Sequence, residues 1–199
     1  MTEDKVKQIK QSFRLRMNGV ASRSMRDKGM EYKLNWGVAL PDLQEMAQEY
    51  GKDYDLAVAL WKENIRECKI LATLIMPVER MLPDLVELWI EQTASQEIEE
   101  LAVFNLYQYL DYAPDLAYAW IATDNTIRQL SGFQLLACMF KQGKEPDERD
   151  INELFDQAQA VLEGDALSVK HAAMNALYAF CDIGEEYELL THKALPLYL

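Results

Sequence analysis

The sequence predicts an all-α fold, built as a solenoid of antiparallel helix pairs. No stretch of five or more residues alternates apolar and polar side chains with β-branched enrichment, which is the pattern of a strand. The 8 glycines and 6 prolines fall between periodic segments, as residues that interrupt helices do. Helix pairs recur at intervals of about 30 to 45 residues, which is typical of an α-solenoid. For 199 residues we expect a single domain spanning 1–199.

The N-terminal segment, residues 1–35, is expected to form a basic helical segment. Val6, Ile9, Phe13 and Met17 recur at helical spacing, so they would form one apolar stripe that docks on the rest of the chain. Residues 1–33 hold nine Lys/Arg against four Asp/Glu, a net charge of +5. Two roles remain open for these cations, DNA anchoring and pairing with the acidic remainder. The candidate DNA-binding residues here are Arg14, Arg16, Arg23, Arg26 and Lys28.

Three later helices are expected to begin at the same tripeptide, Pro-Asp-Leu, at Pro41, Pro83 and Pro114. Proline suits the first turn because it lacks only an N–H that would be unpaired there. The following Asp suits the positive end of the helix dipole. The expected helices span residues 3–20, 41–50, 54–63, 65–76, 83–92, 96–111, 114–122, 125–140, 149–162, 166–181 and 185–195.

Two of these helices share a longer match at a spacing of 31 residues. Residues 84–89 and 115–120 both run from Asp-Leu to Trp without a gap, and residues 55–61 are similar with one extra residue. After each Trp, a short polar break precedes a second, more apolar helix. Because the Trp recurs at one repeat position, we expect these three tryptophans to be core residues.

The second helices begin with a branched apolar residue followed by a basic one, at Arg66, Arg128 and Lys170. This pattern resembles the HEAT repeat, with a non-repeat helical bundle as the alternative. In a solenoid the three cations would form a ladder on one face. They could bind phosphates, or they could hydrogen-bond within and between repeats. The acidic composition favours the second role, although Arg66 and Lys170 stay candidate DNA contacts.

Charge and cysteine content exclude several classes of protein. The net charge of −13 argues against a general nucleic-acid or anionic-membrane surface. It is the sum of +5 in residues 1–33 and −18 in residues 34–199. No apolar run approaches the roughly 20 residues of a membrane-spanning helix, and the first residues lack a secretory pattern. Cys68, Cys138 and Cys181 have no close pair, so we expect buried thiols and a cytoplasmic protein.

Several segments together resemble the DNA alkylation repair family, the HEAT-like-repeat alkylpurine DNA glycosylases. Residues 37–47, Gly-Val-Ala-Leu-Pro-Asp-Leu-Gln-Glu-Met-Ala, are similar to an early segment of that family. Leu-Trp at 60–61 followed by residues 65–72 resembles its next helix pair. Residues 120–125, Trp-Ile-Ala-Thr-Asp-Asn, resemble a later junction. The resemblance extends from about Arg23 to Phe180.

The resemblance implies a protein that binds duplex DNA and excises purines alkylated at N3 or N7. Hydrolysis of the N-glycosidic bond needs no metal and no cofactor, because a cationic base is already a good leaving group. In the family a carboxylate stabilises the oxocarbenium-like charge on the sugar, and aromatic side chains hold the backbone around the lesion.

The family's functional positions are only partly kept in this sequence. Glu100 falls where the family has its Asp, but the aromatic residues beside it are missing. Leu130 stands at the family's Arg position, with Arg128 half a turn earlier, and Asn175 stands at a late Trp position. Glu100 and Arg128 are therefore the candidate catalytic residues. Glycosylase activity is left open, and the alternative function is a non-catalytic α-solenoid scaffold that binds a basic protein segment.

Overall fold

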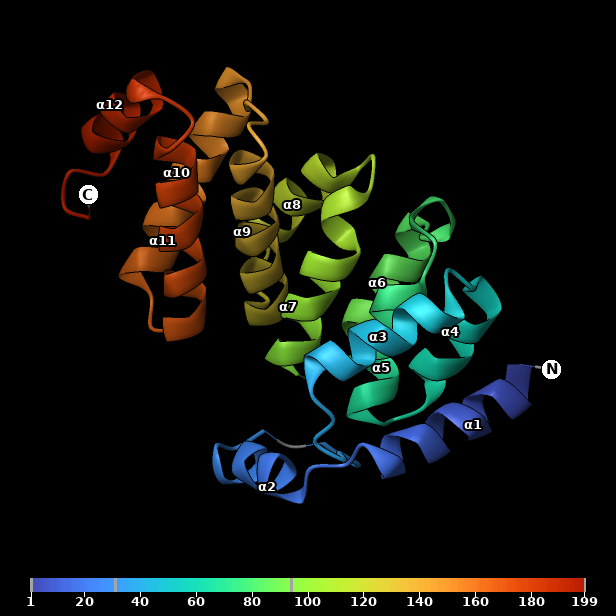
Figure 1. Cartoon of the computed structure of the whole chain (residues 1–199). Helices are drawn as coiled ribbons and strands as arrows, with labels where there is room; N and C mark the ends of the chain where they lie inside the picture. Colours follow the sequence, from blue (N-terminus) through green and yellow to red (C-terminus); the bar gives the residue numbers. More distant parts are fainter. Residues whose placement is uncertain (1, 31, 94, 199) are drawn as a thin grey trace. The chain divides into compact units, whose positions relative to one another are not determined.

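The computed structural model describes residues 2–30, 32–93 and 95–198 (Figure 1). Within these residues the chain forms twelve α-helices, two short 3-10 helices and no strand, which confirms the all-α prediction. The helices are α1 (Thr2–Leu15), α2 (Gly19–Asp27), α3 (Leu40–Tyr50), α4 (Tyr54–Lys62), α5 (Arg66–Ile75), η1 (Val78–Arg80), α6 (Pro83–Glu91), α7 (Gln96–Asn105), η2 (Tyr107–Tyr109), α8 (Ala113–Ile121), α9 (Thr126–Lys141), α10 (Glu148–Glu163), α11 (Leu167–Cys181) and α12 (Glu185–Ala194).

The chain divides into two compact units, residues 1–106 and 107–199. The first unit contains α1 to α7, and the second contains η2 and α8 to α12. The expectation that the whole chain acts as one domain stays a prediction.

The three Pro-Asp-Leu tripeptides start helices as predicted. Proline occupies the first or second position of α3, α6 and α8. Other helices begin with a side-chain cap, in which an Asp or Asn oxygen accepts a backbone N–H of the first turn. Asp53 caps α4, Asn125 caps α9 and Asp147 caps α10. Local sequence therefore fixes most helix starts.

The N-terminal helix expected over residues 3–20 is wrong in one respect, because the segment forms two helices. α1 ends at Leu15, and Asn18 caps α2 by accepting the backbone N–H of Ala21 at 3.0 Å. Val6, Ile9 and Phe13 are buried as predicted. Met17 lies beyond the end of α1, so it leaves the apolar stripe and is 59% exposed. The helix expected over 96–111 likewise ends early, at Asn105, and is followed by η2.

The core of the first unit is centred on α5, which packs against α3, α4 and α7. Trp61 of α4 and Trp89 of α6 stack with their ring centres 3.9 Å apart and their planes 3° from parallel. The indole N–H of Trp61 donates to the side chain of Gln92 at 3.1 Å. Both tryptophans are buried, which confirms their predicted core role.

The core of the second unit is centred on α9, which packs against α8 and α11. Gly132 lets α9 approach α8 closely, because a Cβ there would lie 2.8 Å from Cγ2 of Ile121 and 2.9 Å from the Ala117 carbonyl oxygen. Trp120 is buried and meets the ring of Tyr107 edge-on at 5.8 Å. It therefore has the predicted core role as well.

Two of the three cysteines are buried in the helical core. Cys68 and Cys138 are buried and Cys181 is partly exposed. Burial raises the pKa of the Cys68 and Cys138 thiols, which keeps them protonated and unreactive. Across the described ranges, no helix combines the length and the apolar character needed to cross a lipid bilayer.

Candidate nucleic-acid interface

Some cations of the N-terminal segment serve to dock α1 on the first unit. The apolar side of α1 packs against α4, and its basic side chains reach over the edge of the contact. The hydrogen bond from Lys5 lowers the pKa of the Asp53 carboxyl. The ion pairs join Lys5 to Asp53 at 2.8 Å, Lys10 to Glu63 at 3.1 Å and Arg16 to Glu45 at 3.5 Å. Pairing with acids of the chain, one of the two predicted roles, thus applies to these three cations.

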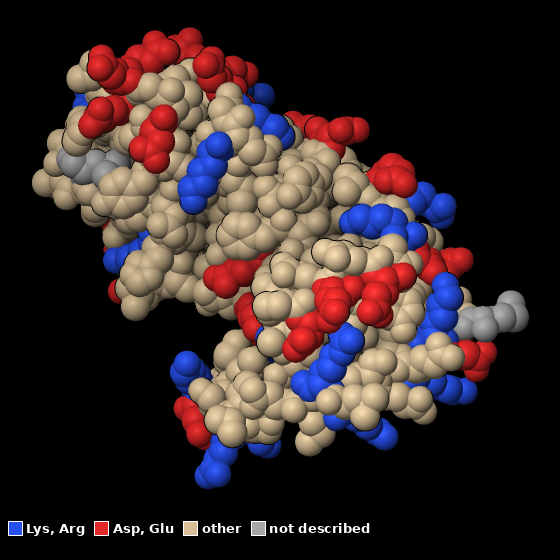
Figure 2. All heavy atoms as spheres, in the orientation of Figure 1, with Lys and Arg blue, Asp and Glu red and all other residues tan. Residues whose placement is uncertain are grey.

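Four of the remaining six cations of the segment are predicted DNA contacts whose side chains are open to solvent. Arg14, Arg23, Arg26 and Lys28 are exposed, and none of them forms an ion pair with another residue that the structure describes. Arg23 and Arg26 are three residues apart on α2, so they share one helix face. Figure 2 shows Lys and Arg side chains spaced along the edge of the first unit that α1 and α2 form. Arg14 lies at the end of α1, and the other three lie on α2 or directly after it. We call these four cations the α2 cation cluster, and they are available to a ligand.

α2 is fixed in place by the segment that follows it. The backbone N–H of Asn18 donates to the Trp36 carbonyl at 2.9 Å, and the Ser22 hydroxyl donates to the Asn35 carbonyl at 2.9 Å. Gly37 has φ +71°, and a Cβ there would lie 2.3 Å from the Asn18 carbonyl oxygen. Only glycine satisfies both the backbone conformation and the close approach.

A buried carboxylate holds this segment on α5. Glu67 is 0% exposed, and its Oε1 accepts the backbone N–H groups of Trp36, Gly37 and Val38 at 3.1, 2.9 and 3.3 Å. Nη1 of Arg66 donates to the same oxygen at 3.3 Å, and these four donors compensate for much of the cost of burying its charge. Glu67 fixes the segment that binds α2, and it therefore determines the position of α2 on the repeat helices of the first unit.

Arg66 completes the same network and is 4% exposed. Its Nη2 and Nε bind both carboxylate oxygens of Glu97, at 2.6 and 2.8 Å, and its Nη1 donates to the Val38 carbonyl at 3.1 Å. The Tyr32 hydroxyl donates to the same carboxylate. Burial raises the pKa of Glu97, but the hydrogen bonds from Arg66 and Tyr32 outweigh it and hold that pKa below its ordinary value. This geometry favours the repeat-bonding role for Arg66 over phosphate binding.

The two other residues of the predicted basic ladder lie in the second unit. Arg128 is half-buried in the first turn of α9, where its backbone N–H donates to the capping Asn125 at 3.0 Å. Lys170 on α11 is partly exposed, as Arg128 is, and forms no ion pair with the residues that the structure describes. Lys170 is therefore the ladder residue best able to meet a ligand.

The candidate catalytic carboxylate Glu100 lies on α7 in the first unit. It is half-exposed, and its Oε1 accepts a hydrogen bond from the Gln96 side chain at 2.8 Å. Its neighbour Glu99 is 0% exposed. The burial of the two carboxylates Glu67 and Glu99 is not among the sequence predictions. Helical spacing gives a signal for the second, because Glu99 shares a face with buried Val103 four residues later.

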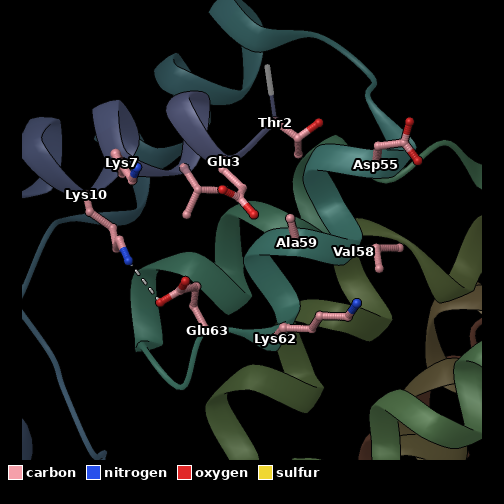
Figure 3. Close-up of a pocket in the computed structure, with 10 residues that line it drawn as sticks. Thr2, Glu3, Lys7, Lys10, Asp55, Val58, Ala59, Lys62 and Glu63 are labelled. Atoms are coloured by element: carbon pink, nitrogen blue, oxygen red, sulfur yellow. Dashed lines mark hydrogen bonds and ion pairs between the residues drawn. The ribbon is translucent and has the colours of Figure 1, made fainter.

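A pocket of about 670 Å³ lies between α1 and α4 (Figure 3). Three lysines line it, together with the three acids Glu3, Asp55 and Glu63. Lys10 and Glu63 form an ion pair with each other. The pocket therefore offers no excess positive charge to a phosphate. Among residues 2–30, 32–93 and 95–198, no group of three His, Cys, Asp or Glu side chains could hold a metal ion.

Residues 9–181 match the family described as the DNA alkylation repair enzyme family. The chain belongs to the DNA alkylation repair enzyme family. The match covers most of the sequence and includes the helices from α2 to α11, whereas Lys5 and Lys7 lie before it and α12 lies after it. No curated protein matches the sequence significantly.

A solved structure also resembles this family member. It is described as one of "a new family of proteins related to the HEAT-like repeat DNA glycosylases with affinity for branched DNA structures". The TM-score is 0.80 at 17% sequence identity, over 96% of this chain and 80% of that one. At that identity the likeness concerns the fold, and it confirms the predicted HEAT-like helical architecture.

Proposed function

We propose that this protein binds DNA through phosphate contacts from the α2 cation cluster, and that its ligand is branched DNA. The observation that carries the proposal is the division of the N-terminal cations. Three are paired with acids of the chain, whereas Arg14, Arg23, Arg26 and Lys28 are exposed without an ion pair among the described residues. Unpaired guanidinium and ammonium groups are the donors that phosphates attract.

The charge distribution supports a local rather than a general DNA surface. A chain of net charge −13 repels a polyanion on most of its surface, so binding would depend on the basic N-terminal segment. Family membership supports DNA as the partner, and the structural relative's affinity for branched DNA supports the choice of ligand. Lys170, half-exposed in the second unit, is a further candidate contact.

The salt dependence of binding tests this proposal. For a branched DNA, we expect the logarithm of the affinity to fall linearly with the logarithm of salt concentration. Arg23→Ala combined with Arg26→Ala removes two phosphate contacts, so the slope should become shallower by about 1.8. The matched control is Lys144→Ala with Lys193→Ala, two exposed cations of the second unit, which should leave the slope unchanged.

Two results would contradict DNA binding by this cluster. One is an unchanged slope in the Arg23 and Arg26 variant. The other is negligible binding of the wild-type chain at every salt concentration, which would favour the scaffold that binds a basic protein segment.

Excision of N3- or N7-alkylated purines is the finer activity that we propose for this family member, with Glu100 of the first unit as the carboxylate beside the sugar. Arg128, the other candidate catalytic residue, belongs to the second unit. The half-exposed position of Glu100 supports its assignment over buried Glu99, because only an accessible carboxylate can stabilise charge on a bound sugar. Release of methylated purines from alkylated duplex DNA should exceed that of a no-enzyme control and should fall at least tenfold in Glu100→Gln. No release at high protein concentration would remove the enzymatic part of the proposal and leave DNA binding intact.

A further inference from the structure

Three large apolar side chains are exposed at the corner between α1 and α2. Leu15 is 88% exposed, Met17 is 59% exposed and Val20 is 82% exposed, all within six residues of chain. Exposed apolar residues scattered singly need no explanation, but a cluster with polar surroundings marks an interaction surface. We call Leu15, Met17 and Val20 the apolar corner.

Hydrogen bonds and buried contacts hold the backbone of the apolar corner in place. The N–H of Asn18, in the middle of the corner, is bonded to the Trp36 carbonyl, and the Asn18 carbonyl packs on Gly37. Phe13, two residues before Leu15, is fully buried and contacts the ring of Trp36 at 5.6 Å. Buried contacts therefore fix the backbone of the corner, while its apolar side chains face solvent. A partner would bind a preformed surface.

Charge next to the apolar corner indicates what kind of partner fits it. Arg14 precedes Leu15 directly and Arg23 lies one helical turn beyond Val20, and both are exposed. A polyanion with an apolar surface between its charges is complementary to this arrangement. A lipid surface fits less well, because the apolar face of α1 is already buried and only the corner remains to insert.

We propose that the apolar corner packs against the base pair that is left unstacked at a branch point of DNA, between phosphates contacted by Arg14 and Arg23. This inference rests on the proposed binding of branched DNA and adds the residues that distinguish a branch from a continuous duplex. At a branch, the terminal base pair of an arm lacks a stacking neighbour, so apolar side chains can cover it without the cost of unstacking a duplex. The corner would act as a specificity determinant, and the cations would supply affinity.

The test compares Leu15→Ser combined with Val20→Ser against the wild-type chain, using a three-way DNA junction and a linear duplex of equal length. Both residues are more than 80% exposed, so the variant should melt at the wild-type temperature. We expect its affinity for the junction to fall about tenfold while its affinity for the linear duplex stays unchanged. A 2-aminopurine base placed at the branch should report the contact, with a fluorescence change on binding that the variant loses.

The matched control is Leu189→Ser combined with Leu197→Ser, two exposed leucines of the second unit, which should keep the junction preference. An unchanged junction preference in the Leu15 and Val20 variant would overturn the inference but not DNA binding itself. Binding of the same variant to anionic lipid vesicles is also measured. If the variant loses vesicle binding while its junction binding is unchanged, the inference is overturned in favour of a membrane surface. Absence of any DNA binding by the wild-type chain would remove the proposed function and this inference together.

Discussion

Arg66, at a position where a repeat residue could bind a ligand, instead bonds to neighbouring groups of the protein. Its guanidinium is bidentate to Glu97 and also bonds the Val38 carbonyl, so it joins α5, α7 and the segment behind α2. Removing it would leave the Glu97 carboxylate and a buried carbonyl without their strongest donor. Breaking a buried pair in this way is far more costly than never having formed it.

We therefore predict that Arg66→Ala lowers the free energy of unfolding by about 3 to 5 kcal/mol. Lys170→Ala is the matched control, because Lys170 follows a buried branched residue in the same way but is half-exposed. The control should change stability by no more than about 0.5 kcal/mol. Urea unfolding of both variants measures the difference, and equal effects would contradict the structural role of Arg66.

Glu97 gives the first unit a predicted sensitivity to acid. Its pKa is below the ordinary value in the folded chain, so the unfolded chain takes up its proton first as the pH falls. The stabilisation is complete above the unfolded pKa of about 4.3 and is lost as the pH falls through the lower folded pKa. In Glu97→Gln the acid-dependent loss should be smaller than in wild type between about pH 5 and pH 3. Unfolding free energies measured across that range test this, and parallel curves would contradict it.

At the residue scale, the sequence predicts the core tryptophans better than it predicts the Arg66 network. The Trp positions follow from a recurring Asp-Leu…Trp segment in the chain itself, with Trp89 and Trp120 spaced by 31 residues and Trp61 and Trp89 by 28. The pairing of Arg66 with Glu97 depends on where α7 lies on α5, and no local pattern encodes that. The predicted bonding within and between repeats named no partner for Arg66, and its neighbour Glu67, although within 3.3 Å of Nη1, mainly binds backbone N–H groups.

Among the elements, α2 was missed and most others were found. Its nine residues, Gly19–Asp27, lack an apolar period strong enough to stand out, and only Ser22 is buried. The Asn18 cap was a local signal for its start, but the expected continuation of the apolar stripe to Met17 concealed it. Helices that begin at Pro-Asp-Leu carry their own start signal, which is why α3, α6 and α8 begin within about one residue of the prediction.

The placement of α2 yields a prediction about Gly37. Gly37→Ala would force a left-handed conformation on an L-residue and would also drive its Cβ into the Asn18 carbonyl. We expect α2 to detach, with faster tryptic cleavage after Arg23 and Arg26 and weaker DNA binding. The control is Gly51→Ala, which has φ +66° but meets nothing within 4 Å, so it carries the conformational strain alone. Equal cleavage rates in the two variants would contradict a docking role for Gly37.

For the whole molecule, the fold and the family could be predicted from the sequence, whereas the candidate site could be predicted only in part. Helix periodicity and repeat spacing belong to the chain itself and gave the all-α HEAT-like architecture. The division of the N-terminal cations into paired and unpaired groups could not be predicted, because it depends on which acids lie within reach after α1 docks. Net charge alone cannot reveal that division.

The net charge of the chain leads to a prediction that distinguishes long-range repulsion of DNA from direct contact between DNA and acidic side chains. If DNA binds the α2 cation cluster, acids elsewhere weaken binding only through the summed field of the protein, which salt screens over about 30 Å at 0.01 M and about 10 Å at 0.1 M. Asp156→Asn, Glu163→Gln and Asp165→Asn are exposed changes in the second unit that take the net charge from −13 to −10. We expect DNA affinity to rise about twofold to threefold at 0.01 M salt and not at all at 0.3 M, because the screening length is then only a few ångströms. A gain that persists at 0.3 M would mean that these acids lie at the interface itself, and would place DNA on the second unit instead of on α2.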